Sequence, residues 1–352
     1  MDFKNCLIRT TLSLLPKSNQ ASRPLDAPQR ILVVSTTALG DTLWATPALG
    51  SLRASFPKAY IGVLTSPIGI QILKHNPCID RLFILKEPML PQFMKLKKIL
   101  SNEQFDTVLI FHASQRLILP LCSLLGAKRI IGTEKLNKGF DDLLTEPLIQ
   151  TYEHEIVRRL RMVEKIGGTI TSETLSFFLQ PEEKLPPRSG TWIAIHPGSK
   201  DGFKRWPTKN FIAVGNALKK HLSCNILVTG TNSETNLMKE VAEGIEGAVL
   251  SDPNLSLRGF AALLKQMQLL ICNDTGPFHL ACALNTPALG IYSATDPNLC
   301  GPHKALLSQA IAKKKSCTPC LKRKCKEPFC LLQIGPDPVV QSALQLLGQS
   351  FS

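Results

Sequence analysis

The sequence predicts an α/β protein with two doubly wound domains in tandem, and three observations support this. The chain has 352 residues, which suits two domains of about 150 residues each better than one core. Short β-branched runs alternate with helical stretches, the pattern of a parallel sheet with helices on both faces. A stretch at residues 170–190, rich in proline and charge, interrupts this alternation, so we expect the interdomain linker there.

The first domain is expected at residues 30–175, after a lead-in at residues 1–29. A short apolar run at residues 31–34 predicts the first buried strand, and a loop of small residues leads from it to a helix over residues 42–56. Further strands are expected at residues 60–64, 82–85, 107–111 and 129–131.

The second domain is expected at residues 190–335, followed by a C-terminal helix at residues 336–352. Pro207 suits the first turn of a helix that extends to about residue 221. Doubly wound sheets bind ligands outside the carboxyl ends of their strands, so two such domains facing each other predict a cleft between them. The strands are expected at residues 192–195, 225–228, 248–250, 269–272 and 287–292.

The charge of the chain predicts an anionic partner. Lysine and arginine number 41 against 27 acidic residues, a formal net charge of +14, which attracts nucleic acid, anionic lipid or phosphorylated substrates. There are only three tyrosines and three tryptophans, and no basic segment is interleaved with aromatic residues. A stacking surface for nucleic acid is therefore not expected, and we predict no nucleic-acid partner.

The N-terminal residues 3–15 mix apolar side chains with Lys4 and Arg9. No apolar run in the chain reaches the roughly 18 residues of a membrane span, and Arg9 interrupts what would otherwise resemble a signal-peptide core. Two interpretations stay open for this segment, a helix packed on the domain and an amphipathic helix on a membrane surface. The chain has eleven cysteines, and this odd number without a signal peptide favours a reducing cytoplasm.

Four of these cysteines cluster near the C-terminus, among many lysines and arginines. Four thiols so close together can bind structural zinc; a disulfide or redox role and a reduced cysteine-rich loop are the alternatives. No Asp-x-Asp arrangement is placed to hold a divalent metal on a diphosphate, so we expect metal-independent chemistry without a required cofactor. The four residues are Cys317, Cys320, Cys325 and Cys330.

The loop after the first strand, Thr36–Asp41, is the first candidate site. Its small residues, Thr37 and Gly40 among them, let the backbone turn tightly and approach a ligand. Asp41 stands at the start of the next helix, where it can act as an N-cap or present a carboxylate to a ligand. The Gly-x-Gly-x-x-Gly spacing of dinucleotide sites is absent here.

The loop His196–Pro207 follows the first strand of the second domain, and its composition suits a diphosphate. Ser199 offers a hydroxyl and a backbone amide, and Lys200 and Lys204 offer positive charge. The alternative is a solvated basic loop.

Two further loops also follow strands. The segment Asn273–His279 ends a buried strand and opens a helix, so its free amides and the helix dipole predict an anion site. Asp274 would repel a bound phosphate, and we expect it to cap or orient the loop, whereas His279 is either packed or functional. In the segment Thr229–Glu234, the acid can accept hydrogen bonds from a ribose diol or serve in the first turn of a helix.

Together these segments resemble glycosyltransferase family 9, the ADP-heptose:lipopolysaccharide heptosyltransferases. Their order and spacing agree over nearly the whole chain from residue 30, and the cysteine-rich stretch is also similar to a segment in many members. The resemblance implies a GT-B architecture, in which two Rossmann-like domains face each other across a cleft, and inversion at the anomeric carbon. The matching stretches are Ile31–Ala54, His196–Phe211, Leu227–Glu234 and Cys272–Pro302.

The resemblance also implies roles for individual residues. Asp41 matches the family's proposed general base, in the acceptor-side loop with Thr37 and Gly40, and Lys204 matches the lysine that binds the donor phosphate. Many members carry Lys or Arg where this chain has Ser35, which leaves the acceptor's identity open. The positions that match donor-binding residues are Ser199, Lys200, Glu234, Asp274, Thr275, Gly276 and His279.

The activity implied is transfer of heptose from ADP-heptose to a lipopolysaccharide core. The expected partners are a nucleotide-diphospho-sugar donor and an anionic, lipid-linked glycan acceptor. We expect a cytoplasmic enzyme with possible peripheral contact at the inner face of the cytoplasmic membrane. A sugar-nucleotide epimerase on the same fold and a non-catalytic sugar-nucleotide-binding protein are the alternatives.

Overall fold

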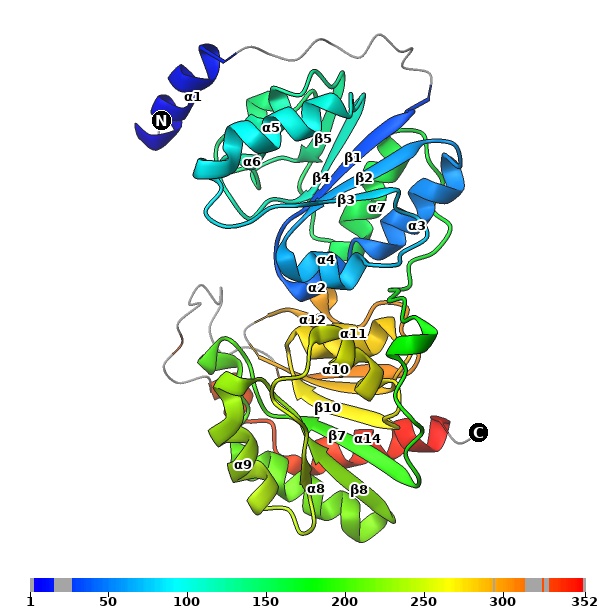
Figure 1. Ribbon diagram of the computed structural model, residues 1–352. Coiled ribbons are helices and arrows are strands. Elements are labelled where there is room, and N and C mark those ends of the chain that lie inside the picture. Colours follow the sequence, from blue (N-terminus) through cyan, green and yellow to red (C-terminus); the bar gives the residue numbers. More distant parts are fainter. Residues whose placement is uncertain (1–2, 16–26, 294, 314–324, 326–328, 351–352) are drawn as a thin grey trace. The chain divides into compact units, whose positions relative to one another are not determined.

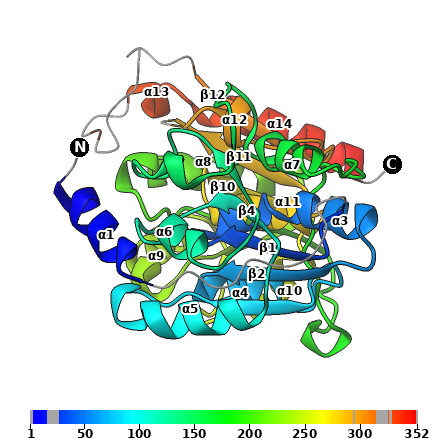
Figure 2. The same cartoon turned by 90° about the horizontal axis from the view of Figure 1, so that it is seen from above.

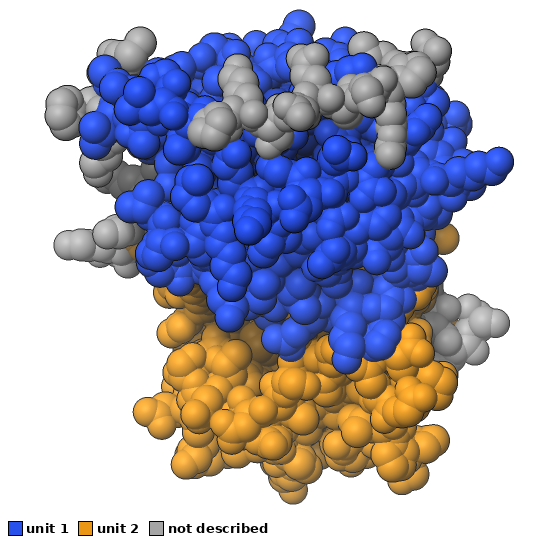
Figure 3. Space-filling model, turned by 45° about the horizontal axis from the view of Figure 1, so that its top comes forward, with its two compact units in different colours: residues 1–173 blue, residues 174–352 orange. Residues whose placement is uncertain are grey.

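The computed structural model describes residues 3–15, 27–293, 295–313, 325 and 329–350 (Figure 1). The chain divides into two compact units, Met1–Glu173 and Thr174–Ser352, which Figure 3 shows in separate colours. The boundary falls within the proline-rich stretch at residues 170–190. Each unit has a parallel six-stranded sheet with its own apolar core, which confirms the predicted α/β class.

The sheet of unit 1 has the strand order β3-β2-β1-β4-β5-β6, with every pairing parallel. The order reverses between β1 and β4, and such a reversal point is where open α/β sheets bind ligands. The strands are β1 (Arg30–Ser35), β2 (Tyr60–Thr65), β3 (Arg81–Ile84), β4 (Thr107–His112), β5 (Arg129–Thr133) and β6 (Glu146–Leu148). The helices are α1 (Phe3–Ser13), α2 (Leu39–Leu43), α3 (Thr46–Ser55), α4 (Pro67–Leu73), α5 (Phe93–Asn102), α6 (Ile118–Ser123) and α7 (Glu155–Lys165).

Two features of unit 1 differ from the sequence pattern. The helix expected over residues 42–56 is two helices, because Pro47 lies in the first turn of α3; inside a continuous helix it could not donate a hydrogen bond to the preceding turn. The short edge strand β6, which contains Pro147, is not predicted by the pattern, since three partly exposed residues with a proline give no periodic signal.

Helix α1 packs on unit 1. Ile8, Leu12 and Leu15 lie against the core cluster formed around β1 and β4, and the Arg9 guanidinium forms an ion pair with Asp142 at 2.6 Å. The structure therefore supports the packed-helix interpretation of the N-terminal segment. Within the described parts of the chain, no helix combines the length and the apolar character needed to cross a membrane.

The sheet of unit 2 repeats the topology of unit 1, in the order β12-β11-β10-β7-β8-β9, and here the order reverses between β7 and β10. The strands are β7 (Thr191–His196), β8 (Cys224–Val228), β9 (Val249–Leu250), β10 (Leu269–Asn273), β11 (Ala288–Tyr292) and β12 (Ser308–Ala312), the last of which the sequence pattern does not predict. The helices are α8 (Thr208–His221), α9 (Thr235–Glu243), α10 (Leu257–Leu264), α11 (Gly276–Ala283), α12 (Pro297–Cys300), α13 (Phe329–Leu332) and α14 (Pro336–Ser350).

Helix pairs on the sheets hold the site elements in place. In unit 1, α3 and α7 lie side by side in both Figure 1 and Figure 2. In unit 2, α14 packs on α8, and the indole of Trp206 donates to the Ile334 carbonyl at 2.8 Å. The loop before α8 is thus anchored at its helical end through Trp206.

Candidate active site

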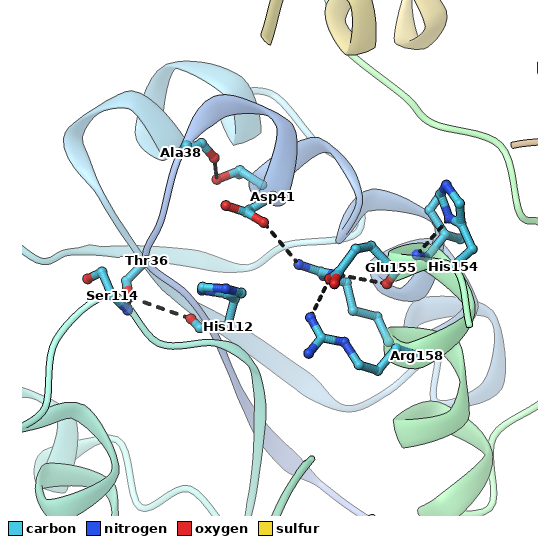
Figure 4. Close-up of polar contacts among 11 residues, drawn as sticks. Thr36, Ala38, Asp41, His112, Ser114, His154, Glu155 and Arg158 are labelled. Carbon is cyan, nitrogen blue, oxygen red and sulfur yellow. Dashed lines mark hydrogen bonds and ion pairs between the residues drawn. The ribbon is translucent and has the colours of Figure 1, made fainter. Parts of the chain in front are cut away.

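Asp41 lies in the first turn of α2, just beyond the carboxyl end of β1. The N-cap of α2 is Ala38, which makes no side-chain capping bond, so the alternative of Asp41 as the N-cap is wrong. Its side chain is 22% exposed, and its Oδ1 lies 3.8 Å from Nη2 of Arg159 on α7. Figure 4 shows the carboxylate turned toward this part of α7.

Hydroxyl and backbone groups tie the Asp41 loop to the neighbouring strands. The Thr36 amide donates to the His112 carbonyl at 3.2 Å, and the Ser114 amide donates to the Thr36 hydroxyl at 3.0 Å (Figure 4). The Ser66 hydroxyl donates to the Thr37 carbonyl at 3.0 Å. These bonds join the ends of β1, β2 and β4, so the loop is fixed from both sides. Gly40 is buried beneath it.

A cavity of about 480 Å³ lies beside this loop. Three of its lining residues carry hydroxyl groups, and one acid and one lysine add a single charge of each sign. Such a lining suits a sugar, because hydroxyls both donate and accept hydrogen bonds and the charges balance. The lining residues are Thr36, Ser66, Pro67, Leu85, Lys86, Glu87 and Ser114.

A charged cluster next to Asp41 is not evident from the motifs. It consists of Glu155, Arg158 and Arg159 on α7 and His112 at the end of β4. Burial alone would raise the pKa of Glu155, but the two arginines outweigh it and hold this pKa below its ordinary value. Burial, together with the charges of the arginines, lowers the pKa of His112 against the opposing pull of Asp41. The imidazole is therefore neutral at neutral pH.

In the sequence, one signal could have revealed this cluster. Ile156, Leu160 and Val163 form the buried stripe of α7, and Arg159 is buried beside them at 0% exposure. An arginine on the apolar face of an amphipathic helix breaks the expected pattern and is rarely buried unless it has a partner.

In unit 2, Asn273 joins the two loops that meet at the sheet reversal. Its Nδ2 donates to the carbonyls of Pro197 at 2.8 Å and Gly198 at 3.2 Å, and its Oδ1 accepts from the Trp206 amide at 2.9 Å. Asn273 is fully buried at the end of β10. The basic loop after β7 and the loop after β10 are thus joined to each other by the hydrogen bonds of Asn273.

Lys204 and Asp274 face each other across these two loops. The Lys204 ammonium lies 2.6 Å from Oδ2 of Asp274, with side chains 19% and 7% exposed. The Thr295 hydroxyl also donates to this carboxylate. Of the neighbouring candidates, Ser199 is buried with its carbonyl accepting from Nε of Arg205 at 2.8 Å, whereas Lys200 is exposed. The Lys204 ammonium is therefore fixed in position by Asp274.

Glu234 lies in a capping box of the short helix η5 (Asn232–Glu234) after β8. The Thr231 amide and hydroxyl donate to its Oε2 at 3.0 and 2.8 Å, so the first-turn interpretation describes its local role. Its Oε1 lies against Gly198, where an added Cβ would come within 2.2 Å of that oxygen. The carboxylate is thus held between the loop after β8 and the basic loop.

Helix α11 presents its N-terminus at the same edge of the sheet. Gly276 is its first residue, and its N-cap, Thr275, makes no side-chain capping bond. Pro277 has no amide hydrogen, and the Phe278 amide donates to the Thr275 carbonyl at 3.1 Å, so the Gly276 amide is the first-turn group that can donate to an anion. His279 is 4% exposed and meets the ring of Phe278 edge-on at 5.4 Å between ring centroids. The histidine is thus packed within the helix.

The cysteine cluster is only partly described. Cys317 and Cys320 lie outside the described residues, whereas Cys325 is half-buried and Cys330 is buried, both as free thiols. Among the described residues, no group of three or more potential metal ligands gathers.

Two Rossmann-like domains in tandem are the architecture of a GT-B glycosyltransferase. In unit 1 the segment after β1 carries the Asp41 carboxylate, and in unit 2 the loop after β7 is basic. The model of glycosyltransferase family 9 (heptosyltransferase) matches residues 93–330, and the chain belongs to this family. It is 26% identical to lipopolysaccharide heptosyltransferase 3 of Escherichia coli over 73% of this chain and 81% of that protein. It is 25% identical to lipooligosaccharide heptosyltransferase 2 of Campylobacter jejuni, over 91% and 99% respectively.

Solved structures agree on the fold. A family 9 glycosyltransferase from Veillonella parvula superposes with a TM-score of 0.82 at 22% identity, covering 94% of this chain and all of that one (100%). An E. coli heptosyltransferase solved with ADP gives a TM-score of 0.74 at 19% identity, covering 90% and 99%. The chain is thus a glycosyltransferase of the lipopolysaccharide heptosyltransferase type, as its motifs predict.

Proposed function

We propose that this enzyme transfers heptose from ADP-heptose to a lipopolysaccharide core acceptor, with inversion and without a metal ion. The observation that carries the proposal is the Lys204–Asp274 pair beside the N-terminus of α11. It combines the Lys204 ammonium with the Gly276 amide, and both can donate hydrogen bonds to a diphosphate.

On the donor side, Lys204 and the Gly276 amide stabilise the negative charge that develops on the departing diphosphate. When the diphosphate displaces Asp274 from Lys204, the ammonium supplies the positive charge that a divalent cation supplies in other transferases, which supports metal-independent chemistry. The buried Glu234 carboxylate can accept hydrogen bonds from the donor ribose. The choice of ADP-heptose is supported by one E. coli heptosyltransferase, which has been solved both with ADP and with ADP-2-deoxy-2-fluoro heptose.

On the acceptor side, Asp41 accepts the proton of the attacking hydroxyl as the general base. The acceptor oxygen then bonds to the anomeric carbon as the bond to the diphosphate breaks, through an oxocarbenium-like state. A single displacement of this kind inverts the anomeric centre. The cavity beside Thr36, Ser66 and Ser114 suits the acceptor sugar that carries this hydroxyl.

The test is calorimetric binding of ADP, UDP and GDP to the wild type, Lys204→Ala and Lys209→Ala. Lys209 is exposed on α8, so its substitution removes the same charge nearby without touching the pair. We expect selective ADP binding, weakened about 10- to 100-fold in Lys204→Ala because a charged hydrogen bond is lost, and little changed in Lys209→Ala. Equal loss in both variants, or no nucleotide binding at all, would contradict the donor assignment.

An epimerase on the same fold is tested by incubating the donor without acceptor. Epimerised donor as the product would favour that activity, whereas intact donor that is consumed only with a lipid-linked glycan supports glycosyl transfer.

We also propose peripheral contact with an anionic membrane surface, which the net charge of +14 supports. A basic enzyme is attracted to anionic lipid headgroups, and a lipid-linked acceptor is presented at that surface. Co-sedimentation with vesicles of anionic and of neutral lipid checks this. Equal binding to both kinds of vesicle, or none to either, would contradict it.

A further inference from the structure

The proposed base belongs to a group of four charged side chains, in which the two arginines are buried and the two carboxylates are partly exposed. Arg159 is fully buried, and its Nη1 donates to both the backbone carbonyl and Oε2 of Glu155 at 2.6 Å. Arg158 contacts the same carboxylate, and Asp41 completes the group. Two guanidinium groups and two carboxylates balance, so the cluster is neutral without a bound ion.

One side of the Arg159 guanidinium donates no hydrogen bond within the described part of the chain. Its Nε and Nη2 are buried without a hydrogen-bond partner among the described residues, and Nη2 lies 3.8 Å from Oδ1 of Asp41. A buried donor without a partner is costly, and for a charged group the cost is larger still. A shift of about 1 Å by the Asp41 carboxylate would bring it to the ordinary hydrogen-bond distance of about 2.8 Å for such a pair.

The Arg159 guanidinium cannot easily move to meet this need. Glu155 holds Nη1 from one side, and the guanidinium carbon lies 5.8 Å from the centre of the Trp44 ring on the other. Asp41 is the less enclosed partner, because its side chain is 22% exposed whereas the Arg159 side chain is 0% exposed. The fixed guanidinium is therefore placed to orient the carboxylate.

We propose that Arg159 is the positioning residue of Asp41, aiming the carboxylate for proton abstraction, with Glu155 fixing the guanidinium. This inference rests on the proposed function of Asp41 as the base. An anionic group of the acceptor is a poor alternative partner for the free side of the Arg159 guanidinium. The charges of the cluster already cancel, and the neighbouring His112 is neutral.

The test compares the wild type with Arg159→Met, Arg159→Lys and Arg161→Met in steady-state heptosyl transfer. Arg161 lies on the same helix and pairs with Glu153 at the surface, so it is the matched control. We expect Arg159→Met to lower kcat about 10- to 100-fold, the scale of a base misplaced by about 1 Å. The KM for donor and the Kd for ADP should stay within about twofold, since donor binding is untouched.

Two further arms separate positioning from a structural effect. Arg159→Lys keeps the charge but loses the planar fork, so it should recover part of the lost kcat. Guanidinium ion added at concentrations that leave the wild type folded should raise the kcat of Arg159→Met and leave Arg161→Met unchanged. Thermal melts establish that each assayed variant is folded.

The outcomes distinguish this inference from the proposed function. If the wild type transfers no heptose to any core acceptor, the proposed function fails and the inference fails with it. If the wild type is active and a folded Arg159→Met matches it in kcat, only the positioning role is overturned. A loss confined to donor KM, or an equal loss in Arg161→Met, overturns it as well.

Discussion

Replacing Gly198 with alanine should destabilise unit 2 and weaken its donor site through Glu234. The new Cβ would lie 2.2 Å from Oε1 and 2.3 Å from Cδ of Glu234, whereas ordinary contacts begin at 3.4 Å. The carboxylate must therefore move by about 1 Å, which breaks its capping bonds to Thr231. Loss of such a cap costs about 0.5–2 kcal/mol. In a unit of this size that corresponds to a decrease in Tm of about 1–8 °C.

Differential scanning calorimetry and ADP titration measure the two consequences, with Gly202→Ala as the control. An added Cβ at Gly202 meets nothing within 4 Å, although this residue lies in the same basic loop. We expect ADP affinity to fall about tenfold in Gly198→Ala, since one lost hydrogen bond to a charged group is of that order. Unchanged melting would refute the packing argument, and lower melting with unchanged ADP affinity would remove Glu234 from the donor site.

Three other predictions address the base, the buried histidine and the cysteines. Asp41→Asn should lose at least about 100-fold in kcat, the usual contribution of a general base, with ADP affinity retained; loss of ADP binding instead would count against the assignment. Burial lowers the pKa of His196, although Glu234 opposes this. The unfolded chain therefore binds the proton at a higher pH than the folded chain, and the free energy of unfolding should fall as the pH drops below about 6.5. Urea unfolding of His196→Gln should show a weaker pH dependence of this free energy, and an unchanged dependence would exclude His196 as the cause. Metal analysis of protein purified without chelator should show about one zinc per chain if Cys325 and Cys330 belong to a structural site, and under about a tenth of an equivalent rules that site out.

Most of the fold could be predicted from the sequence because buried parallel strands carry a strong local signal. The run at residues 31–34 is apolar at every position, and it lies within β1 as expected. The edge strands β6 and β12 were not predicted, because neither contains a fully buried residue, whereas the edge strands β3 and β9 were predicted. The split between α2 and α3 was missed for a different reason: Pro47 is compatible with either the start of a helix or a kink within one.

The candidate site could be predicted only where its residues follow strands in short motifs. Asp41, Lys204, Glu234 and Asp274 all lie in loops after strands, because the topology gathers those loops at one edge of each sheet. Arg159 was missed because α7 lies far from any motif, and its side chain approaches Asp41 only through packing of the folded unit. Long-range pairings of this kind leave no spacing signal in one sequence.

The pairing of Lys204 with Asp274 resolves an apparent conflict in the site's electrostatics. A carboxylate at the N-terminus of α11 should repel a diphosphate, yet here its charge is already matched by the ammonium 2.6 Å away. A donor diphosphate would therefore meet a neutral pair and the Gly276 amide, and it would compete with Asp274 for the lysine. The Asp274 carboxylate keeps the Lys204 side chain oriented before the donor binds. The rotamer entropy of a fixed lysine, about 2 kcal/mol, is then already lost and does not oppose donor binding. In the proposed mechanism, the same pairing limits how tightly diphosphate is held once the sugar has left, which favours product release.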